Sequence, residues 1–276
     1  MDSVDDKWKD SMDDYNVMLV TIGRSSTENG TYLPGVDGVD ASQDLNQTDP
    51  LGLSDDERDL INAAVEAKEN NGGKVIVMLN NANAMEIDEI KNNDGVDAIM
   101  EIGFPGGYGF YGVADILSGE ANPSGHLTDT YAVTNANSPA AQNFGNYEWT
   151  NADPSVNINA EEVEAEDIYT GYKYYETRYA DTVLGQGNAD ATVGSSTGKA
   201  WNYDDEVSYP FGYGLSYTTF EQTLKSVDVD LANRTVTAEV DVKNTGDVAG
   251  KDVVQLYTSV PYTDYDVENK VEKSAV

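Results

Sequence analysis

The sequence predicts an α/β domain with a mostly parallel sheet and helices on both faces, followed by part of an antiparallel β-sandwich. Two observations predict this. In the first half, three apolar runs of strand length alternate with helical segments. After Phe220, apolar and polar residues alternate along stretches that are separated by turn residues. We therefore predict an α/β domain at 1–210, with an irregular Tyr-rich segment at 134–210, and a second domain at 211–276.

Three runs predict the strands of the parallel sheet: Tyr15–Gly23, Lys74–Asn80 and Val96–Ile102. The first is continuously apolar, which is typical of a strand that is buried on both faces. Helical segments separate the runs, so right-handed crossovers are expected to bring the strands together in parallel.

The first helix is predicted from Ser54 to about Glu69. Ser54 and Glu57 have the spacing of a capping box, and Gly72 follows the helical pattern as a stop signal. Short helices are predicted at 86–91 and 112–118. The polar stretch at 24–52 is too long for an ordinary connection, and loops of this size are usually functional or disordered.

The C-terminal part predicts strands at 223–231, 235–244 and 251–260. A complete β-sandwich needs about seven strands. We infer that the sequence is a piece of a longer polypeptide. The alternative is a complete protein with a small three-stranded appendage.

The charge excludes several classes of partner. The chain has 16 Lys and Arg against 50 Asp and Glu, which gives a net charge of −34. Such a chain repels the phosphate backbones of nucleic acids and anionic membranes.

The chain has no Cys, so disulfides and thiolate metal sites are excluded. We expect no membrane span and no signal peptide in this sequence, and the compartment stays unknown.

One motif and one residue are candidates for a cofactor or metal site. Gly107–Gly112 matches G-x-G-x-x-G, and Asp129 lies about 20 residues further on, as in a dinucleotide fingerprint. However, the motif follows the third strand, and bulky Tyr and Phe residues occupy it. We favour a glycine-rich turn that lets a helix pack tightly, with a nucleotide site as the alternative. His126 is the only His and is expected to be solvated or capping. No cofactor and no metal are predicted.

Glu28 is the candidate acid. It follows the carboxyl end of the first predicted strand, where open α/β sheets bind ligands. With a raised pKa it could act as a general acid. In a chain with 50 acids, a solvated loop carboxylate is the simpler interpretation on chemistry alone. The 18 Tyr residues fit either a sugar site or packing of a polar segment, and we favour packing.

Four segments in order resemble the second half of glycoside hydrolase family 3, the β-glucosidase and β-xylosidase family. Each segment alone is weak evidence for the family, but the four segments in this order span nearly the whole chain. The segments are Gly23–Glu28 with Leu53–Glu57, then Gly103–Gly107 with Ala114–Leu127, then Ile168–Tyr175, and finally Tyr209–Phe220 with Asn244–Gly246 and Val254–Tyr257.

The resemblance implies an (α/β)6 sandwich domain and a fibronectin III-like domain that is cut short. It also implies a retaining β-glycosidase that acts on terminal β-linked glucosyl or xylosyl units, with Glu28 as the acid/base. The nucleophilic Asp would lie on a barrel domain that is missing here and could precede or follow this chain. Asn29–Thr31 departs from the usual pattern after the Glu, which leaves another loop acid open. The chain alone is expected to be inactive. The alternative function is a non-catalytic carbohydrate-binding or scaffold protein on the same fold.

Overall fold

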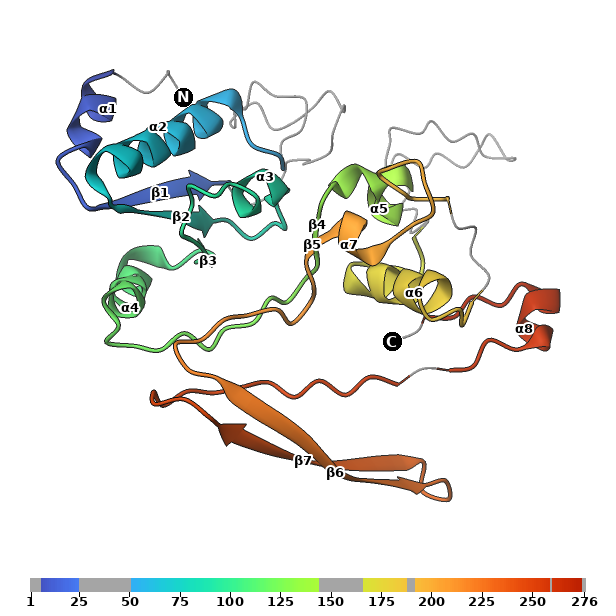
Figure 1. The fold of residues 1–276 in the computed structure, drawn as a ribbon. Coiled ribbons are helices and arrows are strands. Elements are labelled where there is room, and N and C mark those ends of the chain that lie inside the picture. The colour runs from blue at the N-terminus through green and yellow to red at the C-terminus, as the bar shows by residue number, and fades with distance from the viewer. Residues whose placement is uncertain (1–5, 25–50, 144–165, 188–191, 259, 275–276) are drawn as a thin grey trace, which may run out of the picture. The chain divides into compact units, whose positions relative to one another are not determined.

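The computed structural model describes residues 6–24, 51–143, 166–187, 192–258 and 260–274 (Figure 1). Its contacts divide the chain into two compact units. The first unit comprises Met1–Phe104, Thr130–Tyr209 and Ser259–Val276, and the second comprises Pro105–Asp129 and Pro210–Thr258. The domain boundary at 210/211 stays a prediction.

The first unit begins with a three-stranded parallel sheet in the order β1-β2-β3. The strands alternate with helices, as predicted, so the α/β class is confirmed. Gly23 pairs with Asn80 at the end of the β1–β2 ladder. The elements are α1 (Asp6–Met12), β1 (Val17–Gly23), α2 (Asp55–Asn71), β2 (Lys74–Asn80), α3 (Asp88–Lys91) and β3 (Ala98–Glu101).

Helix α2 has both of the end signals that the sequence predicted. The Ser54 side chain accepts a hydrogen bond from the Glu57 backbone N–H, and the Glu57 side chain accepts one from the Ser54 N–H. Gly72 ends the helix with a φ of 74°, a left-handed conformation that costs glycine little. The helix buries Ile61, Ala64 and Ala67, and it packs against β1 and β2.

Strand β1 differs from the prediction in its burial. Met18, Val20 and Ile22 are buried, whereas Val17 and Leu19 are 51% and 48% exposed. Alternate side chains of a strand point to opposite faces, and α2 packs on this sheet. Burial on both faces is therefore wrong for β1 and holds better for β2, where Val75, Val77, Met78 and Leu79 are all buried.

The rest of the first unit is built around aromatic side chains. Tyr175, Trp201, Val207 and Ala132 form a buried cluster against which Tyr174 and Tyr203 pack. Tyr174 and Tyr175 therefore pack as expected, and the choice between packing and a sugar site for the other Tyr residues stays a prediction. The elements are β4 (Tyr131–Ala132), η2 (Asn135–Asn137), α5 (Pro139–Asn143), α6 (Tyr172–Thr182), α7 (Tyr203–Glu206), β5 (Val207–Tyr209) and α8 (Asp264–Asn269).

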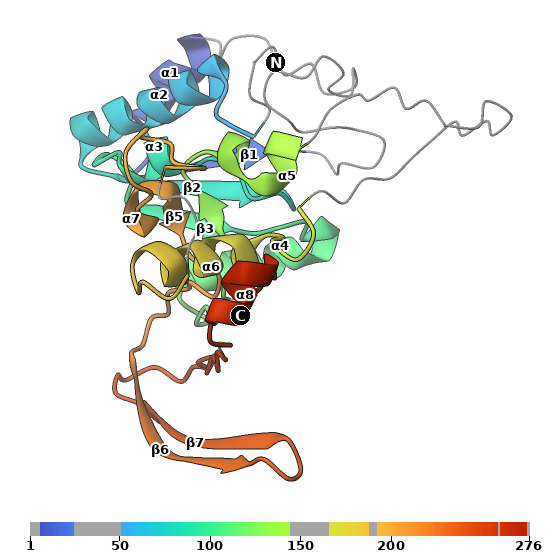
Figure 2. The same cartoon turned by 90° about the vertical axis from the view of Figure 1, so that its right-hand side faces the viewer.

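The chain after α8 returns to α6 (Figure 2). The Tyr169 hydroxyl, just before α6, donates to the Lys273 carbonyl at 3.2 Å, and the Thr177 and Ser274 hydroxyls are 3.4 Å apart. Helix α3 is tied to β5, because Lys91 Nζ donates to the Ser208 carbonyl at 2.7 Å. These contacts link the chain after α8 to α6, and α3 to β5.

The second unit contains α4 (Gly106–Ser118), β6 (Phe220–Asp230) and β7 (Thr235–Asn244). Helix α4 begins six residues before the start that the sequence predicted. The motif Gly107–Gly112 therefore lies inside a helix, with Pro105 at its N-cap. Both the loop of a dinucleotide fingerprint and the favoured glycine-rich turn are wrong at this position.

Strands β6 and β7 form an antiparallel hairpin, as two of the three C-terminal predictions expected. The third predicted strand, 251–260, is not a strand in its described residues, 251–258 and 260. Alternating apolar and polar residues suit one face of a sheet, but a strand also needs a neighbouring strand to hydrogen-bond with its backbone N–H and C=O groups.

Asp97 joins α2 to β2 through its carboxylate. It accepts from Lys68 Nζ at 2.8 Å, from Lys74 Nζ at 2.7 Å and from the Val75 N–H at 2.9 Å. Hydrogen bonds from Lys68 and Lys74 hold the pKa of Asp97 far below its usual value. A lowered carboxyl pKa stabilises the fold above the unfolded-state pKa, and this contribution is lost as the pH falls through the folded-state pKa.

We expect Asp97→Asn to lower the free energy of unfolding by about 1 kcal/mol at neutral pH, because the groups are partly exposed. The difference from the wild type should shrink once the pH falls below about 4. Urea titrations of the chain at several pH values measure this. Asp59→Asn, at an exposed position of α2, is the control. A difference that is the same at every pH would contradict the account.

Candidate functional site

The candidate site lies at the carboxyl edge of the parallel sheet. There β1 ends at Gly23, β2 at Asn80 and β3 at Glu101. The Arg24 N–H donates to the Asn80 carbonyl at 3.3 Å, and the Asn80 side chain donates to the Gly103 carbonyl. Hydrogen bonds thus connect the segments that follow all three strands. Open α/β sheets bind their ligands beyond this edge.

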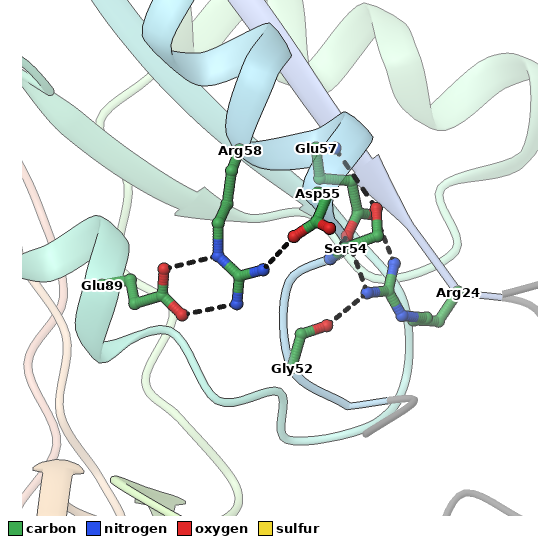
Figure 3. Close-up of polar contacts among 7 residues, drawn as sticks. All are labelled: Arg24, Gly52, Ser54, Asp55, Glu57, Arg58 and Glu89. Carbon is green, nitrogen blue, oxygen red and sulfur yellow. Dashed lines mark hydrogen bonds and ion pairs between the residues drawn. The ribbon is translucent and has the colours of Figure 1, made fainter. Parts of the chain in front are cut away.

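Among the described residues of this edge, Arg24 makes a dense set of contacts (Figure 3). Its guanidinium donates to both Glu57 carboxylate oxygens, at 2.5 and 2.9 Å, and to the Gly52 carbonyl at 2.7 Å. A fourth hydrogen bond reaches the Gly23 carbonyl at 2.8 Å. We call Arg24, Gly52 and Glu57 the Arg24 clasp. It holds together two points of the chain that are 28 residues apart.

Glu57 has two partners at once. Its Oε2 accepts from the Ser54 N–H at 2.8 Å, as the capping box requires, and also from Arg24 Nη2 at 2.9 Å. Its carboxylate also lies at the N-terminus of α2, where the helix dipole favours negative charge. The first turn of α2 is therefore both a helix start and the anchor for Arg24.

Burial distinguishes this ion pair from its neighbour. The side chains of Arg24 and Glu57 are 0% and 15% exposed. Arg58, on the same helix, pairs with Glu89 at 2.7 Å, and these side chains are 38% and 58% exposed. The hydrogen bonds from Arg58 lower the pKa of Glu89. Exposed ion pairs contribute at most about 1 kcal/mol to the free energy of unfolding, whereas breaking a buried pair leaves one buried charge without a partner.

Glu101 is the described carboxylate at the end of β3. It accepts hydrogen bonds from the Tyr131 hydroxyl at 2.8 Å and from the Gly103 N–H at 2.7 Å. Desolvation raises its pKa, while these two donors act in the opposite direction. Through the Tyr131 hydroxyl, the carboxylate links β3 to β4. These two hydrogen bonds hold the end of β3 in place.

Of the two candidate residues from the sequence, the structure describes His126 but not Glu28. Glu28 lies outside the described residues, so its role as acid/base stays a prediction. His126 lies in the second unit, with its Nδ1 3.2 Å from the Ser124 carbonyl and its Nε2 3.8 Å from Asp252 Oδ1. Across the described ranges, no group of three or more acidic or His side chains is arranged to hold a metal ion. Within the same ranges, no helix is long and apolar enough to cross a membrane.

Sequence reasoning missed the Arg24 clasp and the pair of Glu101 with Tyr131. One signal pointed to the clasp, since Arg24 is a basic residue directly after a buried strand in a chain with few basic residues. A charge at such a position needs a partner. Its partners are 28 and 33 residues away, and no sequence pattern names them.

Known proteins match both the sequence and the fold. Residues 2–217 match the model of the glycosyl hydrolase family 3 C-terminal domain. The chain is 29% identical over 251 residues to thermostable β-glucosidase B of Acetivibrio thermocellus, which covers 90% of this chain and 27% of that protein. It is 34% identical over 194 residues to a β-glucosidase of Ruminococcus albus, which covers 69% of this chain and 16% of that protein.

The solved structure of β-glucosidase 3B from Thermotoga neapolitana in complex with glucose agrees with a TM-score of 0.66 at 29% identity. The match covers 99% of this chain and 30% of that one. The chain therefore belongs to glycoside hydrolase family 3, and it corresponds to the C-terminal domain of that family. It spans 16% to 27% of the length of the two curated relatives named above.

Burial of the Arg24 clasp leads to a stability prediction. We expect Arg24→Gln to lower the free energy of unfolding by about 3–5 kcal/mol, because the Glu57 carboxylate loses its buried partner. Arg58→Gln should cost at most about 1 kcal/mol. Urea denaturation of the two variants measures both. Equal losses would show that burial does not set the strength of the Arg24–Glu57 pair.

Proposed function

We propose that this chain supplies the acid/base carboxylate, Glu28, of a retaining β-glycosidase that hydrolyses terminal β-linked glucosyl or xylosyl units. The observation that carries the proposal is membership of glycoside hydrolase family 3 along residues 2–217, a range that includes Glu28. The named relatives are β-glucosidases, which supports a β-linked glycoside as substrate. The second carboxylate, a nucleophilic Asp, lies on a barrel domain outside this chain.

The position of Glu28 supports this role. In the sequence it lies four positions after Arg24, and the described strand β1 ends at Gly23. In a retaining enzyme the acid/base protonates the leaving oxygen while the nucleophile attacks the sugar. It then takes a proton from the water that releases the glycosyl-enzyme. The two carboxyls must lie about 5–5.5 Å apart, so a domain carrying one of them has to present it toward the other.

The domain organisation follows from the same family resemblance. We propose that residues 1–210 form the α/β sandwich domain and that 211–276 begin a fibronectin III-like domain. The β6–β7 hairpin in the second segment supports a β fold there. Whether the barrel precedes or follows this chain is left open by the resemblance.

The acid/base role predicts a selective loss of activity in the full-length enzyme. Glu28→Gln should lower kcat by about 10²–10⁴-fold on alkyl β-glucosides, whose leaving groups need protonation. The loss in the glycosylation step should be much smaller on dinitrophenyl β-glucoside, whose leaving group departs without a proton. Added azide should restore turnover of that substrate, because an anionic nucleophile needs no general base.

Asp37→Asn is the matched control, since Asp37 lies in the same stretch between β1 and α2. It should leave kcat nearly unchanged. Unchanged activity of Glu28→Gln on alkyl glucosides would overturn the acid/base assignment. A selective loss of kcat on alkyl glucosides in Asp37→Asn would instead assign the acid/base role to Asp37.

The need for two carboxylates predicts that the isolated chain is inactive. Purified 1–276 should not release nitrophenol from an aryl β-glucoside above the rate in buffer, because the proposed nucleophile lies elsewhere. Mixing it with the separately expressed barrel domain is the companion measurement. Turnover by 1–276 alone would contradict the proposed division of the site.

A further inference from the structure

The turn between α2 and β2 contains an Asn–Gly pair, and the Asn side chain holds the amino edge of the parallel sheet. Asn71 is the last residue of α2, and β2 begins at Lys74. The Asn71 Nδ2 donates to the Tyr15 carbonyl at 2.6 Å, and the Asn71 Oδ1 accepts from the Gly73 N–H at 2.8 Å. Because Tyr15 lies just before β1, one side-chain amide connects the residues that lead into two neighbouring strands.

An Asn–Gly pair in a freely rotating chain can lose its side-chain amide. The Gly72 nitrogen forms a bond to Asn71 Cγ, and the side-chain nitrogen leaves as ammonia with the proton that the Gly72 nitrogen gives up. Water then opens the succinimide ring at either carbonyl, which gives aspartate or isoaspartate at position 71. Glycine favours ring closure, because it has no Cβ to hinder the approach and its backbone rotates freely.

The fold restrains both atoms that would have to join. The Gly72 N–H donates to the Lys68 carbonyl at 2.8 Å, which holds the nitrogen against the last turn of α2. The Asn71 side chain is fixed by its hydrogen bonds to Tyr15 and Gly73. Gly72 itself is exposed, so water can reach the pair. Ring closure therefore requires this end of α2 to open, but it requires no deeper unfolding.

We propose that Asn71–Gly72 is a deamidation site that the folded chain protects, and that its reaction loosens the amino edge of the sheet. A carboxylate only accepts hydrogen bonds, so the product loses the donor to the Tyr15 carbonyl. It also places a negative charge at the C-terminus of α2, where the helix dipole disfavours it. Isoaspartate in addition inserts a methylene group into the backbone just before β2, the central strand of the sheet. A chain that reacts while this end is open therefore closes less firmly afterwards.

The first test follows deamidation of the full-length enzyme in mildly alkaline buffer, with and without guanidinium chloride, by mass spectrometry of peptides that contain residue 71. The reaction should be at least about tenfold slower in the folded enzyme. Asn29–Gly30, the other Asn–Gly pair of this sequence, is the reference in the denatured enzyme and should react there at a similar rate. An equal rate at Asn71 with and without denaturant would overturn the protection. A denatured enzyme in which Asn29 reacts and Asn71 does not would overturn the site itself.

The second test measures hydrogen exchange of the Lys74 amide, which donates to the Asn16 carbonyl at 2.8 Å in the same part of the sheet. In Asn71→Asp this amide should exchange at least about tenfold faster than in the wild type. Asn62→Asp, at an exposed position of α2, adds the same charge and should exchange like the wild type. If Asn71→Asp does not fold, Asn71→Ala removes the same donor without adding a charge. Unchanged exchange in the Asn71 variant, or an equal increase in Asn62→Asp, would overturn the role of the Asn71 side chain.

Discussion

The described part of the site depends on one buried ion pair. Arg24 leaves the end of a β-strand in a chain of net charge −34, and its charge is enclosed by protein. Such a charge is tolerated only with a well-placed partner and with hydrogen bonds for its remaining donors. Glu57 and the Gly23 and Gly52 carbonyls provide both. The start of α2, the end of β1 and the residues before α2 are therefore fixed relative to one another by the electrostatics of a single side chain.

The parallel sheet brings further polar groups to the same edge. Its three strands end at one edge, and backbone and side-chain hydrogen bonds connect the segments that follow them. Glu101 is held there by Tyr131 and Gly103. Together with the Arg24 clasp, these contacts hold the described part of this edge in place within the first unit.

The sequence predicted elements whose signals are local. Ser54 and Glu57 predicted a capping box, and both of its hydrogen bonds form. Apolar runs predicted β1, β2 and β3. The predictions were wrong where the outcome depends on distant partners or on context. One face of β1 is exposed, 251–258 forms no strand, and α4 begins within a run of glycines that disfavour a helix. The Arg24 clasp joins residues that no local pattern connects. Glu28 came from the family resemblance, because 50 acids offer no local way to choose among them.

The central claim is that one carboxylate of a pair of catalytic carboxylates belongs to this chain. The distance between the Glu28 carboxyl and the nucleophilic carboxylate of the barrel tests it most directly. A structure of the full-length enzyme with a fluorinated glucosyl group trapped on the nucleophile gives this distance. We predict a separation of about 5–5.5 Å, with the Glu28 carboxyl beside the anomeric carbon. Another carboxyl in that position, with Glu28 directed away from the sugar, would contradict it.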